Sequence, residues 1–265
     1  MTGLIRSGVP QKTKNQTGEQ KTQEAGRSVG GALELAPLIG PVPSLSSVPK
    51  RELSVEAVMD LASEILWSEP SREQLLGTDD VDANRAQEYS LLAMLLARPP
   101  DRAALSRIAK LHGDSTPLGL AHLALACAAG NACAEKVDRE YFDLFIGVGR
   151  GELLPYGSYY LTGFLNERPL ARLREDLRAH RIERTEGQAE PEDHVAILCE
   201  IMSGMASGQF PIAIQTQQQF FAKHLAPWIG RFFSDLARAE AAEFYRDVGT
   251  LGRLFLEIEA EAFRL

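Results

Sequence analysis

The stretch Glu190-Pro191-Glu192-Asp193-His194 opens a helix that the sequence predicts to face a hydrophobic core. The apolar residues that follow at helical spacing are Val195, Leu198, Cys199 and Met202. Proline suits the first helical position, where a missing N–H costs nothing, and the helix dipole favours acidic residues in the first turn. Helix initiation therefore explains most of the stretch, although it gives no reason for His194.

Outward from this stretch, helical patterns cover most of the chain, and alternating strand patterns are nearly absent. The expected helices span residues 53–66, 88–97, 101–111, 117–130, 138–145, 170–180, 191–207, 212–225, 227–236 and 241–263. The last of them has a continuous apolar stripe made of Phe244, Val248, Leu251, Phe255 and Ile258. The sequence thus predicts an all-α fold of roughly ten helices.

Three segments are expected along the chain. Residues 1–50 lack hydrophobic periodicity and cannot bury enough apolar surface to offset the entropy of ordering, which predicts a disordered N-terminal tail. Residues 51–80 are expected to form a short amphipathic helix and a linker. Residues 81–265 are expected to form a single helical domain.

The composition excludes several classes of protein. The chain has 265 residues and a formal net charge of −8, which disfavours a nucleic-acid partner. The odd number of cysteines argues against a disulfide framework and fits a reducing cytoplasm. No long apolar stretch or apolar leader is present, so we expect neither membrane insertion nor secretion.

No enzyme or metal site is recognisable. The histidines form no pair at ligand spacing, and no Ser, Cys or Lys nucleophile stands in a catalytic context, so we expect neither catalysis nor a bound cofactor. The glycines of Gly147-x-Gly149-x-Gly151 follow a predicted helix and indicate a helix end and turn. The aromatic run Tyr156, Tyr159, Tyr160 with Phe164 fits either internal packing or the lining of a groove.

Three motifs in order resemble a known family. They are Tyr141 to Gly149, then Leu154 to Tyr160, then Glu-Pro-x-Asp-His at residues 190–194. Together they resemble the TorD/DmsD family of molybdoenzyme-specific chaperones, which includes the NarJ-like proteins. The resemblance covers roughly residues 85 to 265, and Val148 stands where the family usually has proline.

The resemblance implies a TorD-like helical fold and a cytoplasmic chaperone. Its partner would be the catalytic subunit of a molybdopterin-dependent oxidoreductase, whose twin-arginine leader or apo-form it would bind before export. The alternative is a NarJ-type assembly factor that acts on the mature apo-enzyme of a membrane-bound reductase or dehydrogenase. A monomer and a homodimer both remain open.

The client-binding residues are expected to be Glu190, Pro191, Asp193, His194, Tyr156, Tyr160 and Met202. In this hypothesis Asp193 and Glu190 pair with the arginines of the leader, because arginine seeks carboxylate partners. The two tyrosines and Met202 would line a groove for its apolar segment. His194 would bind a peptide backbone group or orient Asp193. Pro191 is included because it belongs to the motif that resembles the family.

Overall fold

The computed structural model of the chain describes residues 51–53, 80–184 and 190–264. Within these ranges the chain forms ten α-helices, one π-helix and two short strands, which confirms the all-α prediction. The predicted tail lies outside the described residues, as does most of the predicted helix at 53–66. Residues 51–53 form a strand, where the sequence predicted the start of a helix and linker.

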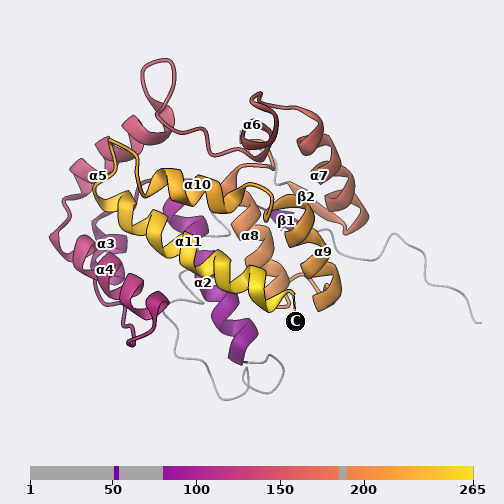
Figure 1. Cartoon of the computed structure of the whole chain (residues 1–265), viewed down its shortest axis with the longest axis horizontal. Coiled ribbons are helices and arrows are strands. Elements are labelled where there is room, and N and C mark those ends of the chain that lie inside the picture. Colours follow the sequence, from indigo (N-terminus) through magenta and orange to yellow (C-terminus); the bar gives the residue numbers. More distant parts are fainter. Residues whose placement is uncertain (1–50, 54–79, 185–189, 265) are drawn as a thin grey trace, which may run out of the picture. The chain divides into compact units, whose positions relative to one another are not determined.

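The helices surround one central pair (Figure 1). Their bounds are α2 Asp80–Ala97, α3 Arg102–Ile108, α4 Pro117–Asn131, α5 Ala134–Tyr141, the π-helix η3 Phe142–Ile146, α6 Gly157–Thr162, α7 Arg168–Ala179, α8 Val195–Ala206, α9 Ile214–His224, α10 Ile229–Leu236 and α11 Phe244–Ala262. The strands β1 Arg51–Leu53 and β2 Ile182–Arg184 pair in parallel, with Arg51 opposite Ile182.

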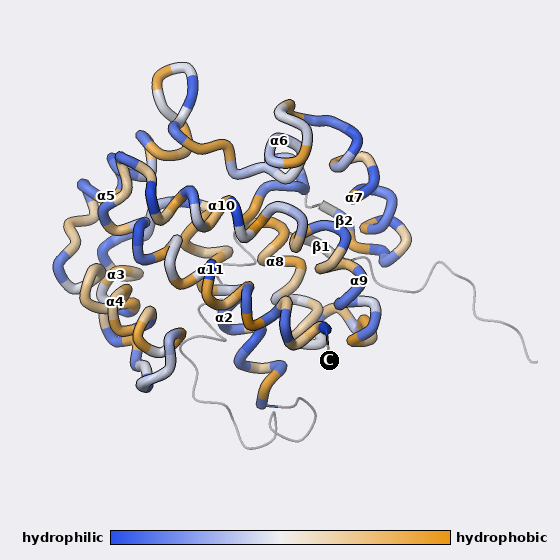
Figure 2. Tube along the Cα trace, viewed as in Figure 1, coloured by the Kyte–Doolittle hydropathy of each residue, from blue (hydrophilic) through white to orange (hydrophobic). Residues whose placement is uncertain are grey.

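The central pair is α2 and α8, and α8 is buried on every side. Each of its residues is buried, so the helix exceeds the one-sided stripe that the sequence predicted. Figure 2 shows hydrophobic residues gathered along α8. Small side chains bring α2 close: the Ser90 and Ser203 hydroxyl oxygens lie 2.7 Å apart, and Ser203 donates to the carbonyl of Ala86 at 3.0 Å.

A buried ion pair joins α2 to α11. The Arg85 guanidinium donates from Nε and Nη2 to the two carboxylate oxygens of Glu259, at 2.8 and 3.0 Å. The Tyr89 hydroxyl donates to the same carboxylate at 3.0 Å. Bidentate geometry and a third hydrogen bond offset the cost of burying both charges.

Local signals predicted two helix starts correctly. Asp101 accepts a hydrogen bond from the Ala104 N–H at 2.7 Å at the start of α3. Thr116 accepts from the Gly119 N–H at 3.0 Å, one residue before the proline that begins α4. Both caps use only neighbouring residues, which is why the sequence alone was sufficient.

The helix expected at residues 138–145 differs from its prediction. The sequence predicted its start at residue 138, but α5 already begins at Ala134 and places Asp138 inside the helix. The chain then widens into η3, which ends at Gly147 with φ of 60°. A Cβ atom at Gly147 would lie 2.1 Å from the carbonyl oxygen of Arg150, so this tight turn requires glycine. The predicted helix end and turn at Gly147 are thereby confirmed.

Candidate functional site

The second and third motifs form one structural unit, which we call the motif pair: residues 155–158 and 190–195. The Val195 N–H donates to the carbonyl of Pro155, and the Gly157 N–H donates to the carbonyl of Asp193, both at 2.9 Å. Tyr156 and His194 thus face each other in an antiparallel bridge. The two motifs are far apart in the sequence but supply one another's backbone hydrogen-bond partners. This gives a physical reason why both motifs occur in the same chain.

This pairing corrects the predicted start of the central helix. The sequence indicated Pro191, but α8 begins at Val195 with His194 as its N-cap. Pro191 instead belongs to a turn. Its carbonyl accepts a hydrogen bond from the His194 N–H at 3.0 Å. Helix cannot extend back to Pro191 because the backbone groups of Asp193 and Val195 are bonded across to residues 155–157.

Asp193 is buried, with 3% of its surface exposed, and it caps α6 from a distant part of the chain. Its Oδ2 accepts from the Ser158 N–H at 2.7 Å, and α6 has no side-chain cap of its own. Among the described residues, neither Asp193 Oδ1 nor the Ser158 hydroxyl has a hydrogen-bond partner. Asp193 therefore holds the start of α6 while one carboxylate oxygen keeps its acceptor capacity.

A small cavity of about 100 Å³ adjoins Asp193, between α6, α7 and α9. Its wall includes Gly157 and Trp228, and a Cβ atom at Gly157 would lie 3.0 Å from the indole nitrogen. Basic groups of Arg172 and Lys223 also line it, so the cavity has both signs of charge. Glycine is needed here for close packing of α6 on the tryptophan.

His194 is a neutral structural histidine. Its Nδ1 accepts from the Ala196 N–H at 3.2 Å, which leaves the proton on Nε2. Its ring meets the Tyr156 ring edge-on, with centroids 5.1 Å apart. Burial lowers the pKa of His194 to about 4, although the charge of Glu190 acts in the opposite direction.

Tyr156 and Glu190 bring the motif pair to the surface. The Tyr156 hydroxyl donates to Glu190 Oε2 at 2.6 Å, and Glu190 is exposed. Burial, followed by the hydrogen bond and charge of Glu190, raises the pKa of Tyr156, so this tyrosine remains a donor. The pair presents an ordered carboxylate to solvent.

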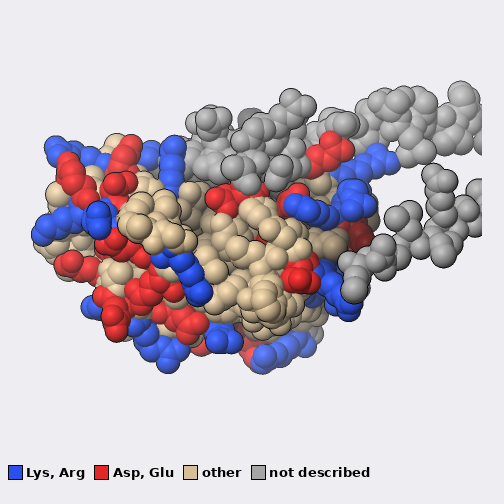
Figure 3. Space-filling view, turned by 90° about the horizontal axis from the view of Figure 1, so that it is seen from above, with Lys and Arg blue, Asp and Glu red and all other residues tan. Residues whose placement is uncertain are grey.

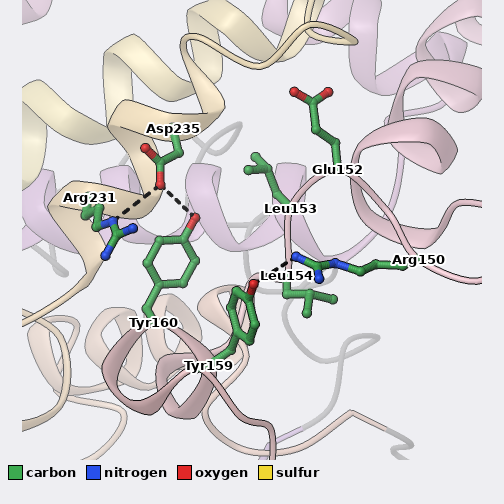
Figure 4. A pocket seen from close by; sticks show the side chains of 9 residues that line it. Arg150, Glu152, Leu153, Leu154, Tyr159, Tyr160, Arg231 and Asp235 are labelled. Carbon is green, nitrogen blue, oxygen red and sulfur yellow. Dashed lines mark hydrogen bonds and ion pairs between the residues drawn. The ribbon is translucent and has the colours of Figure 1, made fainter.

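A second tyrosine–carboxylate pair lies one helical turn further along. Tyr160, whose N–H bonds to the Tyr156 carbonyl at 3.1 Å, donates its hydroxyl to Asp235 Oδ2 of α10 at 3.3 Å. Arg231 and Arg238 contact the same carboxylate only at 3.7 and 3.8 Å. Figure 4 shows Asp235 between Tyr160 and Arg231. The sequence missed Asp235, because no motif links α10 to α6.

Tyr160, Arg231 and Asp235 line a cavity of about 350 Å³ beside α6 (Figure 4). On its other side Arg150 donates from Nη2 to the Tyr159 hydroxyl at 2.8 Å and lies over the same ring. The cavity thus combines aromatic faces with charged groups of both signs. The sequence predicted Tyr160, which lines this cavity, as a site residue but did not predict Arg150.

Apolar side chains are exposed immediately after these tyrosines. Leu161, Phe164 and Leu165 lie in or just beyond α6, and Phe164 is 69% exposed. Figure 3 looks onto the end of the molecule that has α6 in Figure 1 and shows a broad area without charged side chains there. Exposed apolar residues gathered in this way are typical of an interaction surface.

The structure brings together four of the predicted site residues, which are Tyr156, Glu190, Asp193 and His194. Tyr160 lies on the next turn, and Pro191 shapes the turn before α8. Met202 is 0% exposed in the middle of α8 and therefore has no surface to offer a peptide.

Two further findings concern the described ranges. No group of three or more His, Cys, Asp or Glu side chains there could hold a metal ion. No one helix there is both long and apolar enough to cross a membrane, although the bent pair Pro117–Asn131 and Ala134–Ile146 meets both criteria jointly.

Comparison with known proteins gives consistent matches. A family model described as nitrate reductase delta subunit matches residues 112–234. Chaperone protein TorD of Vibrio cholerae is 32% identical over 127 residues, which cover 44% of this chain and 58% of the relative. A Haemophilus influenzae protein named "Probable Tat proofreading chaperone DmsD" is 27% identical over 119 residues, 44% of this chain and 57% of that protein. The matched part is thus less than two thirds of either relative.

Among solved structures, a candidate redox enzyme maturation protein from Archaeoglobus fulgidus aligns with 72% of this chain and 98% of its own. Its sequence identity is 21% and the TM-score is 0.47.

Proposed function

We propose that the chain is a member of the TorD/NarJ family and acts as a chaperone for a molybdenum-cofactor oxidoreductase subunit. It binds the twin-arginine leader and apo-form of that catalytic subunit in the cytoplasm and assists maturation before export. The names of the relatives, which include a probable Tat proofreading chaperone, support this proposal. No catalytic step is part of the proposal.

One observation supports leader binding above the others: two tyrosines four residues apart, beside an exposed apolar surface, each bond to a carboxylate from another part of the chain. Glu190 bonds to Tyr156, and Asp235 bonds to Tyr160. Side chains four residues apart lie on one face of a helix. A leader with two adjacent arginines and an apolar segment matches both features, because arginine pairs with carboxylates and the apolar segment covers exposed apolar surface.

The proposal divides the predicted site residues by role. Tyr156, Glu190 and Tyr160 contact the peptide, together with Asp235. Pro191, Asp193 and His194 act as positioning residues, because their polar groups bond inside the motif pair. Met202 has no contact role here, since it lies in the core.

Calorimetric titration with a synthetic twin-arginine leader peptide tests the proposal. Glu190→Gln and Asp235→Asn should each weaken binding by about tenfold, or ~1.4 kcal/mol, because each removes one carboxylate partner of an arginine. Binding should also weaken as salt is added. Glu257→Gln is the matched control, since Glu257 is an exposed, ion-paired carboxylate on α11.

A leader with two lysines in place of the arginines should bind more weakly to the wild-type protein, because lysine cannot form bidentate pairs. Unchanged affinity in both Glu190→Gln and Asp235→Asn, with melting curves like the wild type, would remove these carboxylates from the binding site.

The family model's description as a nitrate reductase delta subunit favours a second candidate function. In this alternative the chain is a NarJ-type assembly factor for the mature apo-enzyme of a membrane-bound reductase or dehydrogenase. A pull-down with a client that lacks its leader separates the two candidates. Retained binding, unaffected by Glu190→Gln, favours the assembly factor.

A further inference from the structure

A second surface lies where α2 begins and α11 ends, and it shares no residue with the motif pair. This α2–α11 groove has a volume of about 620 Å³. Its walls are the first two turns of α2, the last two turns of α11 and the segment from His112 to His122. Figure 1 shows these helix ends at the far side of the molecule from α6.

The apolar stripe of α11 continues beyond the core into this groove. Phe255 is 3% exposed and packs internally, whereas Ile258, one turn later, is 50% exposed. Leu118 of α4 contributes apolar surface on the facing wall, and Val81 does so from α2. A stripe that leaves the core and lines a groove is available for an outside partner.

The charged groups of the groove leave it acidic. The positive charge of Arg85 is neutralised by its bidentate pair with Glu259. Glu88 Oε1 lies 2.6 Å from His122 Nε2, while its Oε2 has no partner among the described residues. With Asp114 also on the wall, the charge that remains is negative. A partner with basic groups beside its apolar anchors matches this arrangement.

The shape of the groove fits a helix. The α2 wall runs from Val81 to Glu88, seven residues or about 10 Å, and the α11 wall from Phe255 to Ala262 is equally long. Walls of this length accept about two turns of a third helix, whose anchors recur at i, i+3 or i+4, and i+7. Residues 54–66 of this chain do not match the charge, because their only charged side chains are Glu56, Asp60 and Glu64.

We propose that the α2–α11 groove binds a basic amphipathic helix of a partner protein, independently of leader binding at the motif pair. Ile258 is its central apolar contact, and the exposed carboxylate of Asp114 attracts the basic flank. The proposal does not depend on the identity of the client.

Three synthetic peptides of about 18 residues, or five helical turns, test the proposal with the full chain. One has leucines on one face and lysines elsewhere, the second has glutamates in place of the lysines, and the third scrambles the first. Fluorescence anisotropy should detect binding of the leucine–lysine helix only. Ile258→Ser and Ile258→Lys should weaken this binding, the lysine variant by at least about tenfold, because it adds like charge to a lost apolar contact.

The control is Phe164→Ser, which removes an even more exposed apolar side chain beside α6 and should leave binding of the helix unchanged. Titration of the twin-arginine leader into Ile258→Lys should match the wild type. Equal binding of all three peptides, or binding that Ile258→Lys does not affect, would overturn the proposal.

Two other outcomes would name a different occupant and also overturn it. Tighter binding of the leucine–lysine helix in the variant Leu61→Asp would identify the chain's own segment as the occupant. A dimer seen by analytical ultracentrifugation, and lost in Ile258→Lys, would identify a second copy.

Discussion

The motif pair and the α2–α11 groove are built in opposite ways. In the motif pair most polar groups bond to one another, and it holds two of the three motifs that carry the family resemblance. The groove has no motif, and its apolar side chains come from three elements that are separate in the sequence. Recognisable sequence motifs thus indicate where the backbone conformation is constrained more directly than they indicate which residues form a binding surface. The predictions below test this contrast in order of expected size.

The largest effect is expected where the α11 stripe passes from core to groove. Phe255→Ala should lower the free energy of unfolding by about 3–5 kcal/mol, because it leaves a cavity among buried neighbours. Ile258→Ala should change it by less than about 1 kcal/mol, since half of that side chain is already exposed. Urea denaturation of the two variants measures the difference, and equal losses would show that the groove belongs to the core.

The next effect concerns pH and the buried histidine of the motif pair. The folded pKa of His194, about 4, lies below the unfolded value of about 6.5, so the unfolded chain binds the proton more readily. Its contribution is therefore fully present above pH ~6.5 and is lost as pH falls toward 4, by at most about 3 kcal/mol.

The comparison of wild type with His194→Gln isolates this contribution from the other histidines. The pKa of His224 is also lowered, mainly by burial, whereas Glu88 raises the pKa of His122 against the effect of burial. Unfolding curves between pH 7 and pH 4 should converge for the two proteins as the pH falls. Parallel curves over that interval would contradict a buried neutral His194.

A smaller loss is expected from Asp193→Ala, about 1–3 kcal/mol, because the buried Ser158 N–H would lose its acceptor. Asp193→Asn keeps an acceptor oxygen at the same place and should cost less. Thermal melts rank the variants, and Glu192→Ala in the same turn is the control, since the side chain of its partner Arg174 is 44% exposed. If Asp193→Ala melted like the wild type, the carboxylate would not hold α6.

The smallest effect should come from Tyr156→Phe, which removes one hydrogen bond to an exposed carboxylate. We expect a loss of about 0.5–1 kcal/mol in the free energy of unfolding and a clearer loss in leader binding. Tyr159→Phe, which removes a hydroxyl bonded to exposed Arg150, serves as the matched variant. A larger effect of Tyr159→Phe on leader binding would move the contact surface toward Arg150.

Local chemistry explains which parts of the fold the sequence could predict. The caps at Asp101 and Thr116 depend on residues within one turn, so their prediction was correct. The helix start at Pro191 was wrong, because partners at residues 155–157 take the backbone groups that the helix would have used. The short helix α6 was missed, since its cap comes from Asp193, on a different part of the chain.

The candidate site shows the same limit. Sequence patterns named both segments of the motif pair, yet they could not tell the buried Asp193 from the exposed Glu190. Asp235 was not foreseen, because only tertiary packing brings α10 against Tyr160. The exposure of Ile258 could not be read from periodicity, which continues unchanged where the core ends.

The hydrogen bonds at the base of the motif pair also affect how the chain can change in length. They tie residue 157 to residue 193, so the chain between them begins and ends at one fixed point. Lengthening such a closed loop costs little, about 0.6 kcal/mol for each doubling. Homologues can therefore gain or lose residues there, for example in the turn at Gly163 after α6, without moving the central helix. The same turn is a suitable place to insert a reporter domain.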